Sequence, residues 1–333
     1  MTEPALPPSL LESLTRGSEL VSLGTSGRRS LGCWLVLEKG RPESVVKLSS
    51  LDPEVLAINR LALSGAIQSS AGSYCLAAVE QIRMAPDALV VRYPFVPHQP
   101  LCWPLYHDAR VQQMLAVCAA DFNASNCGRA IRNGLPRKRF SFGLTAKKLA
   151  PILAGDDAAR SDEMAQRAEQ AYGALLVRSR DLGIFQNVCL CHNDLVPSNI
   201  GLLTPPSGPK DRWSQGSTEP PSVDDLRLPF LLLDCDNAVL APFGFDLRFI
   251  LLETSSRSLR FATLQRVSEH YRNRLRSHQM AISVQAIAHA AVLGFADAWL
   301  NVHRRSRTSR YSERFQRCLR FCEVFLQSAD FAV

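Results

Sequence analysis

Two short polar segments, each preceded by apolar residues, constrain this 333-residue chain more than any other feature. The first, CHNDLVPSNI at 191–200, lies between two apolar stretches predicted as short strands. The second, Asp234-Cys235-Asp236, ends the apolar run 231–233. Residues 230–236 read as one strand, and its period of two then places Asp234 and Asp236 on one face. Asp194, Asn199 and these acids then offer the hard oxygen ligands that suit Mg²⁺.

This set of groups matches one class of chemistry. Phosphoryl transfer needs a positioned hydroxyl nucleophile, a metal ion on the phosphates and electrostatic stabilisation, with little covalent work for the protein. An Asp on a tight turn, as at 194, can orient a hydroxyl or accept its proton. The two segments therefore fit phosphoryl transfer.

The pattern HND-x4-N followed by an apolar strand with D-x-D resembles the aminoglycoside phosphotransferase and choline kinase group, which has the protein-kinase-like fold. CHNDLVPSNI is similar to the catalytic loop of that group, and LLDCDNAVLAPFGFDL is similar to its metal-binding segment. The resemblance implies that Asp194 is the catalytic base or hydroxyl-orienting residue. It also implies that Asn199 and Asp234 are Mg²⁺ ligands, with Asp236 either a second metal contact or a structural residue.

The same resemblance gives two further residues a supporting role. It implies that His192 supports the loop backbone and that Asp246, at the start of the next helix, is a structural anchor. The match to a eukaryotic protein kinase is poorer, because the loop of those enzymes has Lys two residues after the Asp, where this chain has Val196.

The N-terminal third adds weaker signals in the expected order. A glycine-bearing hairpin at 23–30 resembles the one that covers nucleotide phosphates, where backbone N–H groups approach closely. Lys47, after two valines on a predicted strand, resembles the lysine that holds the α- and β-phosphates. Glu54 is the only acid on the following helix that could pair with that lysine, and it lies in the first turn. The predicted nucleotide-binding residues are Gly24, Thr25, Ser26, Gly27, Lys47, Glu54, and Arg92, Tyr93 and Phe95 of the strand and hinge at 87–97.

Periodicity and turn residues predict an α+β fold with two lobes. Residues 1–97 are expected to form a small antiparallel-sheet N-lobe with one helix, which begins at the N-cap Asp52 and Pro53 and ends near Gly65. Two more strands are expected at 74–84 and 88–95. Residues 98–333 are expected to form a larger, mostly helical C-lobe.

Three finer expectations concern the C-lobe. Residues 162–182 read as a strong amphipathic helix. The stretches 188–190 and 200–203 read as a strand pair around the catalytic segment. Residues 204–228, rich in Pro, Gly, Ser and Asp, read as a mobile surface loop.

Charge and cysteine content narrow the possible partners. The chain carries a net charge of +7, and residues 247–333 hold 14 Arg, no Lys and 6 acids. On a helix, Arg residues spaced by three and four favour a solvated face over a nucleic-acid patch. No apolar run approaches the ~20 residues of a membrane span, and the N-terminus lacks a signal-peptide pattern. Ten Cys are too few for a disulfide scaffold, which favours the cytoplasm.

The sequence thus predicts an ATP- and Mg²⁺-dependent kinase that phosphorylates a hydroxyl of a small molecule. A sugar, an amino alcohol and an antibiotic-like compound are all candidate acceptors. The excess of Arg argues against a polycation, and Asp297 and Trp299 face different sides of a helix, which is unsuitable for a choline cage. An atypical protein Ser/Thr kinase, a pseudokinase-type binding protein and a basic nucleic-acid binder are the alternatives.

Overall fold

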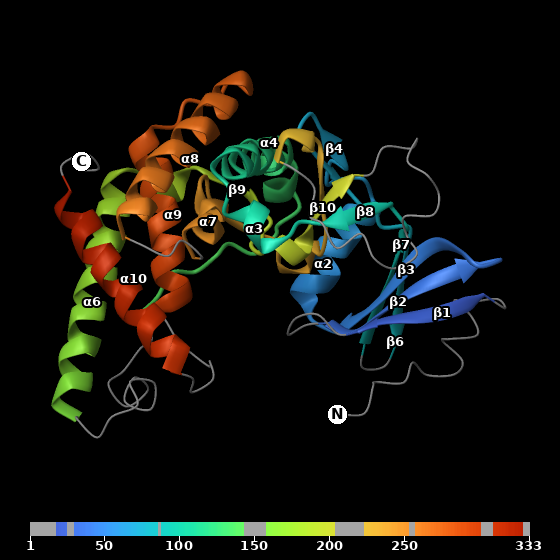
Figure 1. Cartoon of the computed structure of the whole chain (residues 1–333), viewed down its shortest axis with the longest axis horizontal. Helices are drawn as coiled ribbons and strands as arrows, with labels where there is room; N and C mark the ends of the chain where they lie inside the picture. Colours follow the sequence, from blue (N-terminus) through green and yellow to red (C-terminus); the bar gives the residue numbers. More distant parts are fainter. Residues whose placement is uncertain are drawn as a thin grey trace.

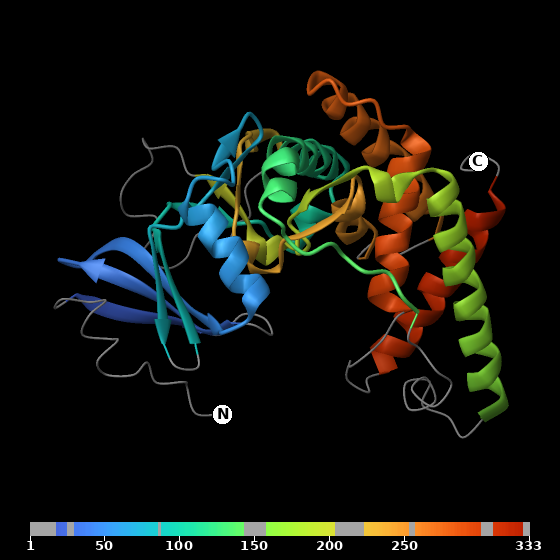
Figure 2. The same cartoon turned by 180° about the vertical axis from the view of Figure 1, so that it is seen from behind.

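The protein has a β-sheet at one end and a group of helices at the other, with further strands between them, as Figure 1 shows. The structure is a computed structural model and describes residues 18–24, 30–85, 88–142, 158–203, 223–252, 257–300 and 309–328. Figure 2 shows from behind that helix α2 lies between the N-terminal sheet and the rest of the molecule. The predicted α+β fold with a small sheet lobe and a larger helical lobe is confirmed.

The first sheet is antiparallel throughout and has the order β1-β2-β3-β7-β6. Val36, Val46 and Val90 are buried on one face of it. Helix α2 covers the other face, where Val55 packs against Leu89 and other strand residues. The bounds of these elements are β1 Glu19–Gly24, β2 Ser30–Glu38, β3 Arg41–Ser50, α2 Pro53–Leu63, β6 Gln81–Ala85 and β7 Ala88–Pro94.

The start of α2 agrees with its sequence signals. The N-cap Asp52 accepts a hydrogen bond from the Glu54 N–H at 2.8 Å, and Pro53 occupies the first turn, where its missing N–H costs nothing. Gly65 follows the helix with φ +68°, a conformation that glycine adopts without strain. The cap at Asp52 therefore begins α2 directly after the end of β3.

A second sheet joins the two ends of the molecule, with the order β4-β5-β11-β10-β8. The prediction of one strand over 74–84 is wrong, because Tyr74–Leu76 leaves the N-lobe sheet and pairs in parallel with β11. Tyr74 is fully buried and packs edge-on against Phe122 of the helical lobe, which explains why this segment joins that core. The bounds are β4 Ser70–Ala71, β5 Tyr74–Leu76, β8 His98–Pro100, β10 Ile200–Leu203 and β11 Phe230–Leu232.

The two strands that flank the catalytic segment belong to different sheets. β9 (Val188–Cys191) pairs with β12 (Val239–Pro242), whereas β10 pairs with β11 and β8. The predicted pairing of 188–190 with 200–203 is therefore wrong. Both connections, 192–199 and 233–238, run from one of these sheets to the other. They consequently lie side by side, which brings the two polar segments of the sequence together.

The helical lobe is built around α9, which is buried on most of its faces. α4 packs on α8, and α6 and α10 pack on α9. α10 buries Phe315, Leu319 and Cys322, and the arginines at 314, 317 and 320 are exposed on its other side. The bounds are α3 Trp103–Tyr106, α4 Ala109–Arg132, α6 Ala158–Asp181, α7 Arg248–Leu252, α8 Arg257–Ser277, α9 Val284–Trp299 and α10 Ser309–Gln327.

Two further expectations meet the structure here. Of the predicted mobile loop, residues 204–222 lie outside the described residues. The last part of it, 223–228, includes a short 3-10 turn; Leu226 is buried against the core, whereas the Asp224 side chain is 82% exposed. In the parts of the chain that the structure describes, no helix combines the length and apolarity that a membrane crossing requires.

Candidate active site

The segment after β9 is held by a single buried carboxylate. Asp246, 1% exposed, accepts the backbone N–H of His192 at 2.9 Å and that of Asn193 at 2.8 Å. Asn123 of α4 donates to the same carboxylate at 3.0 Å. The segment needs this support, because Asn193 has the unusual φ of +66°. These bonds fix the direction in which the next residue, Asp194, leaves the backbone.

Asp246 reaches this position through a close packing contact of the chain just before it. Gly244 has φ +94°, and a Cβ there would lie 2.6 Å from the carbonyl oxygen of Ile287 in α9. Only glycine fits between the turn and that helix. His192 is fully buried, and its Nε2 lies 2.8 Å from the carbonyl oxygen of Leu233, which ties the catalytic segment to the acidic one.

Asp194 is half-buried and is oriented by two amides. Nδ2 of Asn199 lies 3.1 Å from the Asp194 Oδ2, and Nδ2 of Asn237 lies 3.4 Å from the same oxygen. Burial raises the pKa of the Asp194 carboxyl; the charge of Asp234 also raises it, while His192 and Arg248 oppose the shift. The carboxylate is thus fixed in direction and made more basic than a solvated Asp.

Asn199 and Asp234 lie near each other because Leu233, the residue before Asp234, pairs with the backbone of Asn199. The Leu233 N–H donates to the Asn199 carbonyl at 2.9 Å, just beyond the β10–β11 ladder. The strand itself ends at Leu232, so the expectation that it continues through Asp236 is wrong. Asp234 has φ +57° and ψ 62°, a left-handed conformation that Asp tolerates, and a 3-10 turn, η4 (Cys235–Asn237), follows.

Both aspartates of the acidic segment nevertheless converge on Lys47. The Lys47 Nζ lies 2.5 Å from Oδ1 of Asp234 and 2.8 Å from Oδ2 of Asp236. Burial alone would lower the pKa of Lys47, but the charges of Asp236 and Asp234 outweigh it and the net shift is upward. The lysine on β3 is therefore a fixed cation.

A cavity of about 250 Å³ opens between the two lobes at this cluster. Its walls are mostly apolar and come from both sheets and α2. Of the residues predicted from the sequence, it is lined by Lys47, Tyr93, Phe95, Asn199 and Asp234.

Three of the other predicted nucleotide residues, Gly24, Glu54 and Arg92, do not line this cavity. Gly24 ends β1 with φ +85° and is exposed, and Thr25, Ser26 and Gly27 lie outside the described residues. Glu54 is exposed in the first turn of α2. Arg92 forms ion pairs with Glu43 at 3.0 Å and Glu80 at 3.8 Å.

Solved structures of antibiotic phosphotransferases share this arrangement of lobes. A thermostable mutant of aminoglycoside phosphotransferase APH(4)-Ia, in a ternary complex with AMP-PNP and hygromycin B, matches at a TM-score of 0.53 with 12% identity over 97% of this chain and 98% of that one. Macrolide 2′-phosphotransferase MphH from Brachybacterium faecium matches at 0.50 with 15% identity over 88% and 90%. The chain has the fold of the antibiotic phosphotransferases. Neither a protein-family model nor a curated protein matches the sequence.

Within this phosphotransferase fold, sequence reasoning missed two residues of the cluster. Asn59 of α2 is 3% exposed and donates to Oδ1 of Asp236 at 2.9 Å. The available signal was its position one helical turn after the buried Val55, on the apolar side of α2. Arg248 is 8% exposed, and one of its nitrogens, Nη2, donates to both the backbone and the side-chain oxygen of Asn193. No spacing in the sequence connects Arg248 with that loop.

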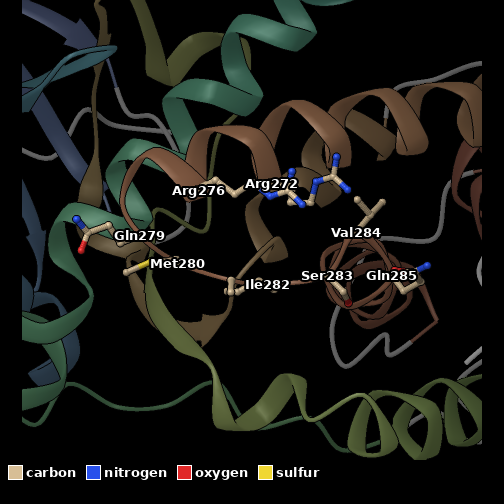
Figure 3. Close-up of a pocket in the computed structure, with 9 residues that line it drawn as sticks. Arg272, Arg276, Gln279, Met280, Ile282, Ser283, Val284 and Gln285 are labelled. Atoms are coloured by element: carbon tan, nitrogen blue, oxygen red, sulfur yellow. The ribbon is translucent and has the colours of Figure 1, made fainter.

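A second hollow of about 560 Å³ lies at the junction of α8 and α9, and it shares no residue with the cavity between the lobes. Figure 3 shows Arg272 and Arg276 on α8 facing the start of α9 at Ser283–Gln285. Ser283 is already the N-cap of α9, accepting from the Ala286 N–H at 3.1 Å. Of the described residues that the sequence predicted for phosphoryl transfer, Lys47, Asn199 and Asp234 line the cavity between the lobes, and none lines this second hollow.

Proposed function

We propose that this chain is an ATP- and Mg²⁺-dependent phosphotransferase that moves a γ-phosphate to a hydroxyl of a small molecule. One observation carries the proposal: Lys47, Asn199 and Asp234 line one cavity, and Asp194 is hydrogen-bonded to Asn199 at its edge. A lysine, an amide and two carboxylates are groups that phosphoryl transfer uses.

The donors beside the cavity fit a magnesium ion. The Asp234 side chain is 19% exposed toward the cavity, and the amide oxygen of Asn199 has no hydrogen-bond partner among the described residues. Carboxylate and amide oxygens are hard ligands of the kind that Mg²⁺ takes together with phosphate oxygens. Two carboxylates also face one lysine here, so one negative charge is left for a cation. The ion would neutralise charge on the phosphates.

The hinge after β7 offers a purine base a single backbone hydrogen-bond donor. Pro94 and Pro97 have no N–H, and the Phe95 N–H already donates to the Glu43 carbonyl at 2.9 Å. The Val96 N–H is then the one donor of 94–97 without a backbone partner among the described residues. The Val96 carbonyl oxygen lies 2.8 Å from Nδ1 of His98. A base with an acceptor nitrogen at this position, such as adenine, matches this single free donor.

Asp194 would act on the acceptor hydroxyl. Asn199 and Asn237 fix its Oδ2, so the other oxygen can point at the hydroxyl and take its proton as the oxygen attacks phosphorus. The raised pKa of Asp194, caused mainly by burial, makes this proton transfer easier. Lys47 would hold phosphate oxygens in line for the attack.

The acceptor side argues against a cationic substrate held by Asp297 and Trp299. Asp297 is paired with Lys138 at 2.8 Å and accepts from the Tyr172 hydroxyl at 3.1 Å. The guanidinium of Arg314 lies 5.4 Å from the centre of the Trp299 ring. A quaternary ammonium group would have to displace both cations, so we propose a neutral or anionic hydroxyl compound, such as a sugar or a hydroxylated metabolite.

The test is ATP consumption against a panel of sugars, amino alcohols and hydroxylated antibiotics, with casein as a protein acceptor. One of the small molecules should raise turnover, and Asp194→Asn should lower that turnover by about 10²- to 10⁴-fold while ADP affinity stays within about twofold. Turnover in Asp194→Asn within about tenfold of the native protein would remove Asp194 from this role. Transfer to casein alone would favour a protein kinase, and ADP binding without any turnover a pseudokinase.

A further inference from the structure

The two aspartates that contact Lys47 lie in different surroundings. Asp234 lines the cavity and its side chain is 19% exposed, whereas the Asp236 side chain is 2% exposed and is not part of the cavity wall. Asp236 moreover accepts from three donors on two elements: Lys47 and Ser49 (2.9 Å) on β3, and Asn59 (2.9 Å) on α2. A carboxylate that is enclosed and fully hydrogen-bonded is poorly placed to bind an ion in the cavity.

The helix beside the lysine has an amide where it faces this cluster. Asn59 donates from Nδ2 to Asp236 and to the Val55 carbonyl, both at 2.9 Å, and its Oδ1 accepts from the Tyr93 hydroxyl at 3.1 Å. An amide has no charge and cannot form an ion pair with Lys47. Glu54, the one acid on α2, is exposed in the first turn. The charge that fixes the lysine therefore comes from the acidic turn and not from α2.

We propose that Asp236 is the positioning residue of Lys47 and that Asn59 in turn aligns Asp236, while Asp234 alone of the two serves the metal ion. This inference rests on the proposed function, because it concerns how the same site holds nucleotide phosphates. A metal ion would draw the Asp234 carboxylate away from Lys47. Asp236 would then keep one fixed negative charge beside the lysine, so that Nζ stays directed at the phosphates rather than following Asp234.

The arrangement has a second consequence for the base side of the cavity. Tyr93 lies on β7 just before the hinge, and its hydroxyl reaches Asp236 through the one side chain of Asn59. The chain Tyr93–Asn59–Asp236–Lys47 thus links the part of the cavity near the base to the part near the phosphates. Loss of Asn59 leaves Oδ1 of Asp236 and the Tyr93 hydroxyl without this partner.

The first experiment compares Asp236→Asn with Asp234→Asn by titrating ADP calorimetrically at a series of Mg²⁺ concentrations. Asp236→Asn places an NH₂ group against donors on both sides, so it should weaken ADP about tenfold or more with the Mg²⁺ midpoint unchanged. Asp234→Asn should instead raise the Mg²⁺ midpoint about tenfold. Equal shifts of the Mg²⁺ midpoint in both variants, or native ADP affinity in Asp236→Asn, would overturn the inference.

A rescue variant separates positioning from simple loss of structure. Asn59→Glu with Asp236→Asn returns a carboxylate to the cluster from α2, on a side chain one methylene longer than Asn59. It should recover a large part of the ADP affinity that Asp236→Asn loses, and no recovery would count against a role in fixing Lys47. Should Asp236→Asn fail to fold, Asn59→Leu replaces it: a several-fold loss of ADP affinity at an unchanged Mg²⁺ midpoint supports the inference, and native affinity overturns it.

The controls distinguish this inference from the proposed function. If the native protein binds no ADP in the presence of Mg²⁺, the proposed function fails. If the native protein binds ADP and the two aspartate variants behave alike, the division of roles between Asp234 and Asp236 fails while the proposed function stands. Glu54→Gln is the matched acid-to-amide change on α2 and should leave ADP affinity within about twofold.

Discussion

The catalytic segment and the acidic turn of this protein follow the same plan with different donors. Each contains one carboxylate to which the proposed function gives a direct role, Asp194 or Asp234, and each depends on one carboxylate that is almost completely buried, Asp246 or Asp236. Asp246 accepts backbone N–H groups and so fixes the shape of a loop. Asp236 accepts hydrogen bonds from side chains, including that of Lys47, and so fixes the direction of Lys47.

The difference predicts which kinetic constant each buried carboxylate controls. A loop that loses its anchor misplaces the group that acts on the acceptor, and this lowers the rate of the chemical step. A lysine that loses its anchor weakens the hold on nucleotide phosphates, and this appears mainly as lost nucleotide affinity. Burial alone would not have distinguished these roles, because Asp236 and Asp246 are 2% and 1% exposed.

The largest effect should follow from Asp246→Asn. The amide can accept one N–H but turns its NH₂ toward another donor, so buried groups lose partners and the unfolding free energy should fall by about 3–5 kcal/mol. In the fraction that stays folded, kcat should drop about 100-fold, since a shift of ~1 Å in Asp194 is enough for that loss. The measurements are urea unfolding and kcat per folded protein, with ADP affinity as the control.

A folded Asp246→Asn protein with native kcat would contradict the comparison. So would a loss of ADP affinity as large as that in Asp236→Asn, because the two buried carboxylates would then not have separate roles. Calorimetric ADP titration on both variants at saturating Mg²⁺ decides between these outcomes.

A smaller effect should follow from Arg248→Lys, because Arg248 also holds the segment after β9, through Asn193. The guanidinium binds both oxygens of Asn193 and stacks on Phe245 and Phe249, at 3.9 and 4.5 Å from the ring centres. Lysine keeps the charge but loses the planar group that makes these contacts together. We expect kcat to fall about tenfold, with KM for ATP within about twofold.

Arg260→Lys is the matched control for this change. Arg260 is 5% exposed and lies over the Phe295 ring at 5.3 Å, where α8 packs against α9. Arg260→Lys should lower the free energy of unfolding by about 1 kcal/mol and leave kcat unchanged. If both variants lower kcat alike, Arg248 acts only through general packing.

Part of this site follows from sequence and part does not, for reasons visible in particular residues. Asp194, Asn199 and Asp234 could be predicted because their residue types and spacing form short sequence patterns. The start of α2 could be predicted because Asp52 caps the helix and Pro53 fits its first turn, and both effects involve only neighbouring residues. The role of Asn59 could not, since an isolated amide on an apolar helix face gives no sign of its partner 177 residues away.

The strand assignments that failed have a similar cause. Residues 230–236 have the composition of one strand, but Asp234 adopts a left-handed conformation that only the surrounding cluster stabilises. The segment 74–84 has strand propensity throughout, yet Tyr74 is taken up by the core of the other lobe. In both cases tertiary contacts, rather than local strand propensity, determine which residues form a strand and which sheet they join.

The smallest effect on activity should follow from Asp121→Asn, a buried carboxylate outside the site. Asp121 accepts from Arg274 at 2.6 Å, lies 2.7 Å from His278 Nε2 and also accepts from the Ser73 hydroxyl, and so ties α4 and α8 to the β4–β5 turn. Arg274 is 36% exposed and remains hydrated, so the loss of unfolding free energy at pH 7 should be about 1–3 kcal/mol. Turnover of the folded variant should equal that of the native protein.

The pH dependence of stability sharpens this last comparison. Burial alone would raise the pKa of Asp121, but its hydrogen bonds from Arg274, His278 and Ser73 outweigh burial and lower it. A carboxyl whose pKa is lower in the folded state stabilises the fold above its unfolded pKa, about 3.9, and this contribution is lost as the pH falls through the folded value. Below about pH 4 the native protein should therefore lose stability more steeply than Asp121→Asn. Urea unfolding between pH 3 and 6 measures both slopes, and equal slopes would show that Asp121 does not contribute to acid stability in the way its surroundings indicate.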